Sequence, residues 1–194
     1  MRGMAETAKG IGKVDSQEES TTKAREENHA AIKGTMVHRL MEVIVSSIGI
    51  KLDDIASISR NIVEENGIDE KDAAYNDYVV MLKNVGETML DKGGYHQVNG
   101  VCSNILDTFR NAKEVLSEVP FYYYKDTMLI NGVIDLVYKD ENGWHIIDWK
   151  TNADNADLDS HYKSQLDLYS EAFEKISGEA VKDAKIYHID ILTK

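Results

Sequence analysis

Cysteine, proline and long apolar runs are scarce in this sequence, and each scarcity excludes a class of protein. The 194 residues contain one cysteine, Cys102, which excludes an internal disulfide and any four-cysteine zinc or iron–sulfur site within the chain. With Pro120 as the single proline, no Pro- or Gly-rich linker divides the chain into two domains. No apolar run approaches the roughly 20 residues needed to cross a bilayer, and the N-terminus lacks a secretion signal. These absences predict one cytoplasmic domain without a membrane partner.

Positive charge is also in short supply. Lys and Arg number 22 against 34 Asp and Glu, which gives a formal net charge of -12. Proteins that hold nucleic acid by bulk attraction cluster Lys and Arg against the phosphates, so the composition argues against that mode of binding. A nucleic-acid substrate remains compatible with this charge if a metal ion neutralises clustered carboxylates, or if a basic partner delivers the substrate.

The hydrophobic pattern predicts a helical part over about residues 21–116. Residues 1–20 are polar and small, and we expect them to form a disordered leader before a single domain at 21–194. Apolar residues at helical spacing predict helices at about 20–50, 53–65, 69–89 and 101–116. Cys102 is then expected to be a small buried residue of the fourth helix.

A sheet-containing core is predicted over about residues 117–194. Runs rich in β-branched and aromatic residues predict strands at 121–124, 128–138, 144–149 and 185–192. A hairpin turn is predicted at 140–143, and a helix at 160–176 is closed by Gly178. The order β-β-β-α-β after helices predicts an α/β fold.

Asp148-Trp149-Lys150 ends one of these strands and is the first candidate site. Asp-x-Lys occurs three times, also at 69–71 and 183–185, so the pattern alone is uninformative. In the 148–150 copy, Ile146, Asp148 and Lys150 share one side of an apolar strand. Taken by itself, this arrangement fits a salt bridge at a strand end better than a catalytic pair.

Asp135 lies in the middle of an apolar run on the preceding strand. An unpaired buried carboxylate is very costly, so Asp135 needs a partner. The hairpin turn brings it beside Asp148, and neighbouring carboxylates repel each other until a cation lies between them. Oxygen ligands suit Mg²⁺ or Mn²⁺. The sequence therefore predicts a divalent metal site at Asp135 and Asp148, with neutralisation by Lys150 alone as the alternative.

Four further candidates are weaker individually. His38 lies at the edge of the apolar face of the first long helix, where an isolated histidine is usually structural. Gln165 and Tyr169 share one face of the last helix, and such a pair more often serves ordinary packing. Glu118 precedes the first strand, where it also fits a cap or a surface charge.

In order and spacing, these segments resemble the RecB/AddA-type nuclease domain, a PD-(D/E)xK nuclease fused to UvrD-like helicases in bacterial double-strand-break repair. The similarity to the AddA branch is strongest. The resemblance spans about Ala30 to Ile189 and rests on five blocks: Gly34-Thr35-Met36-Val37-His38, Glu118-Val119-Pro120-Phe121, Gly132-Val133-Ile134-Asp135, Ile147-Asp148-Trp149-Lys150-Thr151 and Gln165-Leu166-Asp167-Leu168-Tyr169.

The resemblance implies a restriction-endonuclease-like core, α-β-β-β-α-β, with a central mixed sheet flanked by helices and an N-terminal helical extension. It also implies a Mg²⁺- or Mn²⁺-dependent deoxyribonuclease, with exonuclease action expected. The implied metal ligands are His38, Asp135, Asp148 and the Trp149 main-chain carbonyl. Lys150 would activate the attacking water and stabilise charge on the phosphate. Gln165, Tyr169 and, more weakly, Glu118 would border the site and guide DNA.

The resemblance also implies partners: DNA, a UvrD-like helicase region of the same polypeptide and a second helicase–nuclease subunit. The chain carries no helicase motif and lacks the cluster cysteines of the iron–sulfur relatives. Two other classes of function stay open. The acidic charge favours a degenerate nuclease fold that acts as a DNA-binding or assembly module. A different metal-dependent phosphoesterase or RNA nuclease would use the same residue types.

Overall fold

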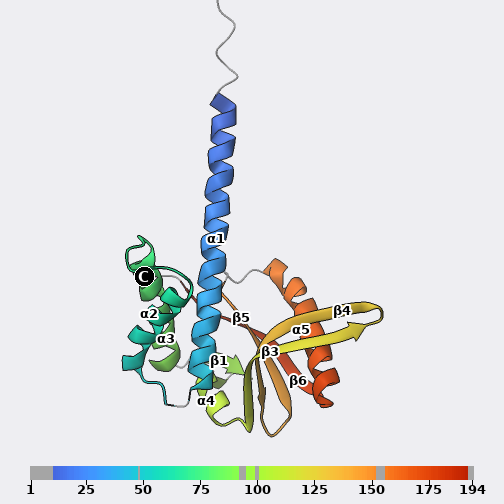
Figure 1. Ribbon diagram of the computed structural model, residues 1–194. Coiled ribbons are helices and arrows are strands. Elements are labelled where there is room, and N and C mark those ends of the chain that lie inside the picture. Colours follow the sequence, from blue (N-terminus) through green and yellow to red (C-terminus); the bar gives the residue numbers. More distant parts are fainter. Residues whose placement is uncertain (1–10, 48, 92–94, 99–100, 152–155, 192–194) are drawn as a thin grey trace, which may run out of the picture.

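The computed structural model describes residues 11–47, 49–91, 95–98, 101–151 and 156–191. Residues 1–10 of the expected leader lie outside this range, whereas residues 11–20 belong to the first helix. Figure 1 shows a group of helices on one side of the molecule and a sheet with its covering helix on the other.

Helices α1 (Ile11–Ser46), α2 (Leu52–Glu65) and α3 (Tyr75–Asp91) form the helical part. The N-terminal half of α1 extends well beyond the other elements in Figure 1. Its C-terminal half carries the buried stripe that the sequence predicts, including Val37, Leu40 and Met41. Among the described helices, none is long and apolar enough to cross a membrane.

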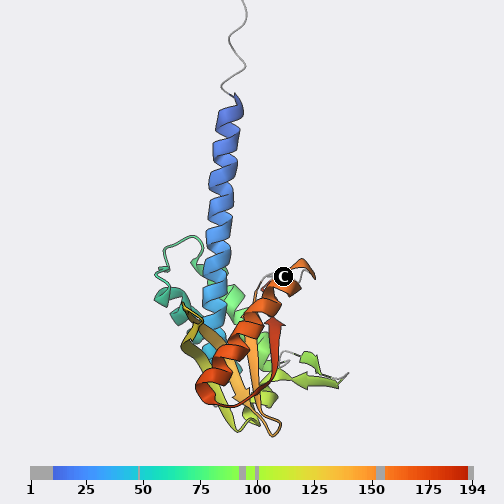
Figure 2. The same ribbon diagram turned by 90° about the vertical axis from the view of Figure 1, so that its right-hand side faces the viewer.

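The central sheet contains four strands in the order β3-β4-β5-β6. Strands β3 (Glu114–Lys125), β4 (Met128–Lys139) and β5 (Trp144–Lys150) pair antiparallel in sequence order. Helix α5 (Ala156–Ser177) then crosses over to β6 (Val181–His188), which runs parallel to β5. Figure 2 shows α5 lying across one face of the sheet. The mixed sheet with flanking helices confirms the predicted restriction-endonuclease-like fold with its N-terminal helical part.

Both predicted chain reversals are confirmed. In the turn after β4, the Asp140 carboxylate accepts the N–H groups of Asn142 (2.7 Å) and Gly143 (3.1 Å). Gly143 has a φ of 134°, a conformation that costs glycine little. Helix α5 ends at Gly178, whose φ is 73° and whose N–H donates to the Glu174 carbonyl at 2.9 Å.

The predicted helix at 101–116 is wrong. Residues Val101–Asn104 form β2, which pairs with β1 (Tyr95–Val98), and only Ile105–Arg110 are helical, as α4. From Glu114 onward the chain pairs with β4 along the whole length of β3. A short apolar run fits a helix turn or a strand equally well, and here the pairing with β4 decides. Cys102 therefore lies on a strand, and the burial of its side chain lies outside what the structure describes.

Two apolar clusters lie on opposite sides of the sheet. Helices α1 to α4 pack with Leu136, Ile147 and Trp149, whereas α5 packs with Val137 and Ile146. Strands β4 and β5 are thus buried on both sides, which explains their nearly continuous apolar sequences. Within these two strands, two carboxylates are buried among the apolar residues, Asp135 and Asp148.

Candidate metal centre

Asp135 and Asp148 lie where β4 and β5 stop pairing through their main chains. The ladder runs from Lys139–Trp144 to Leu136–Ile147, and the two aspartates are the next residues of the two strands. Here the Trp149 N–H donates to Asp135 Oδ2 at 2.7 Å. A side-chain oxygen has replaced a main-chain acceptor, so the Asp135 carboxylate is held in place by β5.

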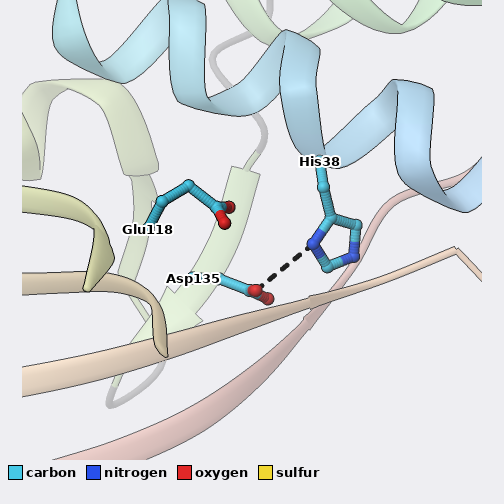
Figure 3. Close-up of side chains that lie close together, drawn as sticks. All are labelled: His38, Glu118 and Asp135. Carbon is cyan, nitrogen blue, oxygen red and sulfur yellow. Dashed lines mark ion pairs between the residues drawn. The ribbon is translucent and has the colours of Figure 1, made fainter. Parts of the chain in front are cut away.

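His38 and Glu118 complete a cluster around Asp135. His38 Nδ1 lies 3.2 Å from Asp135 Oδ1. Figure 3 shows His38 reaching from α1 toward Asp135, with the Glu118 carboxylate beside them. One ligand atom from each of the three residues lies within 4.8 Å of the other two. We call His38, Glu118 and Asp135 the metal cluster.

Glu118 enters the cluster through an unusual backbone conformation. Its φ is 50°, and it lies between the pairs Ser117–Leu136 and Val119–Ile134, level with Asp135. This left-handed region costs a residue with a Cβ roughly 1–2 kcal/mol. Strained backbone of this kind concentrates at functional sites. Glu118 was only a weak candidate in the sequence because β3 was expected to begin at residue 121. A strand that begins at 114 would have placed Glu118 opposite Asp135.

Asp148 lies in a second group on the same side as α5. Its Oδ2 is 2.5 Å from Lys150 Nζ, and its Oδ1 accepts from Gln165 Nε2 at 3.3 Å. Gln165 Nε2 also donates to the Tyr169 hydroxyl at 2.7 Å. The structure thus brings the residues singled out in the sequence into one region, but it divides them between two groups. His38 and Asp135 meet Glu118, whereas Asp148 meets Lys150 and Gln165.

Lys150 is held from two sides. Besides Asp148, its ammonium lies over the ring of Tyr162 on α5, 5.1 Å from the ring centroid. The Lys150 side chain is 19% exposed, so the charge is largely shielded from bulk water. A cation between a carboxylate and an aromatic face is fixed in position while remaining next to the metal cluster's strand.

The ionisable groups of the site retain protons more strongly than usual. Burial raises the pKa of Glu118, and the charges of Asp135 and Glu42 add to the effect. Burial likewise raises the pKa of Asp148, and the charge of Asp135 adds to it, against the opposing effects of Lys150 and His38.

Burial alone would lower the pKa of His38. Its hydrogen bond to Asp135, together with the charges of Asp135, Asp148 and Glu118, outweighs that effect and raises it. All three shifts reflect an excess of negative charge, which a cation would offset.

The donor set fits a divalent metal ion. Carboxylate oxygens suit Mg²⁺ and Mn²⁺, and an imidazole nitrogen also suits Mn²⁺. An open cleft of about 500 Å³ leads to the cluster and is lined by Gly34, Thr35, His38, Arg39, Glu42 and Glu118. The site therefore combines ligands, a nearby fixed ammonium and access from solvent, which are the parts that phosphodiester hydrolysis requires.

Comparisons with known proteins agree with this arrangement. A family model described as the PD-(D/E)XK nuclease superfamily matches residues 12–193. An ATP-dependent helicase/nuclease subunit of the AddA type from Clostridioides difficile (strain 630) is 29% identical over 178 residues, covering 84% of this chain and 14% of the relative. Its counterpart from Clostridium perfringens (strain ATCC 13124) is 25% identical over 183 residues, with the same coverage of 84% and 14%.

A third relative, the corresponding helicase/nuclease subunit of Carboxydothermus hydrogenoformans, is 33% identical over 97 residues, covering 41% of this chain and 8% of the relative. The chain thus spans about 14% of the length of the curated relatives that match most of it. The match over residues 12–193 confirms the resemblance seen in the sequence: the chain belongs to the PD-(D/E)XK nuclease superfamily and is similar to AddA-type helicase/nuclease subunits.

Proposed function

We propose that this chain is a Mg²⁺- or Mn²⁺-dependent deoxyribonuclease domain that hydrolyses phosphodiester bonds at the metal cluster. The observation that carries the proposal is the convergence of His38, Glu118 and Asp135 from three separate elements within 4.8 Å. Family membership supports the same reaction class. Exonuclease action is the mode we propose, in keeping with the AddA-like relatives.

His38, Glu118 and Asp135 would hold the ion, with Asp148 and the Trp149 main-chain carbonyl as further ligands. Such an ion, when bound, polarises a phosphoryl oxygen and lowers the pKa of a bound water molecule. Asp135 is already oriented by the Trp149 N–H. Holding a ligand in place before binding reduces the cost of ordering it.

Lys150 would position the attacking water and stabilise the negative charge that develops on the phosphate. Its ammonium is a compact cation fixed between Asp148 and the Tyr162 ring. Gln165 orients Asp148 and is itself bonded to the Tyr169 hydroxyl, so both α5 residues would border the site and guide the DNA strand.

We further propose that the domain works with an AddA-like helicase region, in the same polypeptide or in a complex, and with a second helicase–nuclease subunit in recombinational repair. The names of the relatives support this setting. We propose residues 21–194 as the folded unit. A degenerate fold that only binds DNA is the competing function, and its motivation is the net charge of -12.

The direct test is hydrolysis of linear single- and double-stranded DNA with Mn²⁺ or Mg²⁺ by the wild type, Asp135→Asn and Asp148→Asn. Each substitution should reduce the rate by roughly a hundredfold or more. Asp183→Asn is a matched control, because Asp183 also belongs to an Asp-x-Lys pattern and also contacts its lysine, Lys185, but lies on β6. Wild-type rates in both site variants, or an inactive wild type that binds DNA without metal, would favour the degenerate module.

A further inference from the structure

The outer parts of β3 and β4, residues 119–133, form a hairpin that we call the arm. Figure 1 shows it projecting from the sheet across α5. One face of the arm is exposed: Tyr122 and Tyr124 are each 69% exposed, Leu129 is 55% exposed and Val133 is 42% exposed. These residues lie on one face because Tyr124 pairs with Leu129, Tyr122 with Asn131 and Pro120 with Val133.

The opposite face of the arm is fixed against α5. Phe121 and Tyr123 are buried in the cluster that contains Phe173. Lys175 lies over the Tyr123 ring at 4.5 Å, and Lys125 Nζ contacts Glu171 at 2.6 Å. The exposed tyrosines are thus carried on a surface that is already ordered, so a ligand would not have to organise it.

The arm differs from the rest of the molecule in charge. Its formal charges are those of Lys125 and Asp126, which cancel, whereas the chain as a whole has a net charge of -12. A polyanion is repelled by most of this protein but not by the arm. Contacts there would go to the bases, because aromatic rings stack on bases of any sequence without a positive charge.

The exposed face leads directly to the metal cluster. It begins at Pro120 on β3 and Val133 on β4, two residues from Glu118 and Asp135 respectively. At ~3.3 Å per residue, Tyr122 lies ~13 Å along the strand from Glu118. The two tyrosines are ~7 Å apart by the same rise, and pairs of exposed aromatics on a sheet face stack successive bases in other single-strand binders.

We propose that Tyr122 and Tyr124 form a stacking platform for the bases of single-stranded DNA that flank the scissile phosphate. The platform rests on the proposed nuclease function for its substrate and explains how so acidic a domain retains a polyanion. A partner protein or a second copy of the chain is the competing occupant of an apolar face.

Binding is measured without catalysis, by fluorescence anisotropy of labelled oligo(dT) with the full chain in EDTA. The Tyr122→Ala/Tyr124→Ala variant should bind more weakly, by roughly 5- to 150-fold for each tyrosine removed. Tyr122→Phe/Tyr124→Phe should bind as the wild type does, because the rings remain. Val80→Ala is the matched control: Val80 is 49% exposed, but on α3, and its loss should leave binding unchanged.

Three outcomes would overturn the platform. They are a wild type that does not bind oligo(dT), equal binding by the double alanine variant, and full binding by Tyr122→Leu/Tyr124→Leu, which keeps an apolar face without rings. Sedimentation of a wild-type dimer that the alanine variant dissociates would instead assign the face to a second copy.

Hydrolysis of bis(p-nitrophenyl) phosphate, which is too small to reach the arm, tests the metal site separately. The alanine variant should match the wild type there. Tyrosine-dependent binding by a wild type that hydrolyses neither this ester nor DNA would leave the platform standing and reject the proposed nuclease.

Discussion

At Glu118, backbone strain and side-chain function oppose each other. Its φ of 50° is unfavourable for glutamate, and its carboxylate lies beside that of Asp135 without a bound cation to separate them. Neither cost is compensated within the residue itself. We infer that the conformation is maintained by the pairs on either side of it, Ser117–Leu136 and Val119–Ile134.

Two substitutions separate these costs. Glu118→Gly and Glu118→Ala both remove the carboxylate, and both should weaken Mn²⁺ binding. Only glycine relieves the backbone, so the glycine variant should be more stable than the alanine variant by roughly 1 kcal/mol in urea unfolding. An alanine variant at least as stable as the glycine variant would show that this conformation carries no strain.

Metal binding should depend on pH because the ligands retain protons. The raised pKa of His38 keeps its imidazole protonated above its usual value of about 6.5. A metal ion must displace that proton, so Mn²⁺ affinity should rise with pH through and above this value. The raised pKa values of Glu118 and Asp148 add a further increase at lower pH.

Calorimetry between pH 5.5 and 8, in buffers of different ionisation enthalpy, measures both the affinity and the protons released. His38→Gln should flatten the part of the profile near and above neutrality while keeping the part at lower pH. A wild-type affinity that does not change over this range would contradict the proposed ligand set.

At the scale of the elements, the arm depends on a close approach between its two strands. Gly132 pairs with Phe121, and a Cβ at Gly132 would lie 2.7 Å from Phe121 Cζ. The ring occupies the space that a side chain on β4 would need. Phe121 in turn packs edge-on against Tyr169, which connects the arm to the candidate site.

Gly132→Ala should therefore destabilise the protein by roughly 1–3 kcal/mol, because Phe121 must move. Gly34→Ala is the contrast: a Cβ there meets Thr151 Oγ1 at an ordinary 3.6 Å, within helix α1. That variant should be unchanged or up to about 1 kcal/mol more stable, since alanine favours a helix. Urea midpoints compare the two, and equal effects would reject the close approach as the cause.

For the whole molecule, the acidic charge limits how DNA can be held. Several lysines already contact carboxylates, including Lys125, Lys139 and Lys150. If bases stacked on the arm provide most of the affinity, few phosphates are neutralised on binding. Binding should then respond only weakly to salt.

The slope of log K against log salt concentration for oligo(dT) should be shallow, with a magnitude below about 2. Each phosphate neutralised on a single strand contributes about 0.7 to this slope. Anisotropy titrations from 50 to 300 mM salt provide the measurement. A steep slope, typical of six or more phosphate contacts, would show that a basic surface holds the DNA.

The sequence by itself determined the features that depend on neighbouring residues. Alternating and continuous apolar runs predicted β4, β5 and the hairpin between them, and helical spacing predicted the buried half of α1. The same reasoning selected the Asp-x-Lys copy at 148–150, because only that copy ends a buried strand. With the order of the five blocks, this was enough to predict the fold and the family.

Tertiary structure decided the start of β3, the entry of Glu118 into the metal cluster and the separation of Asp148 from it. Each depends on pairing or side-chain direction across two or three strands, which no local pattern encodes. The short run before residue 117 fitted helix and strand equally, and only its pairing with β4 placed Glu118 level with Asp135. The exposed tyrosines likewise became apparent only once α5 was seen to cover Phe121 and Tyr123 and to leave the alternate residues uncovered.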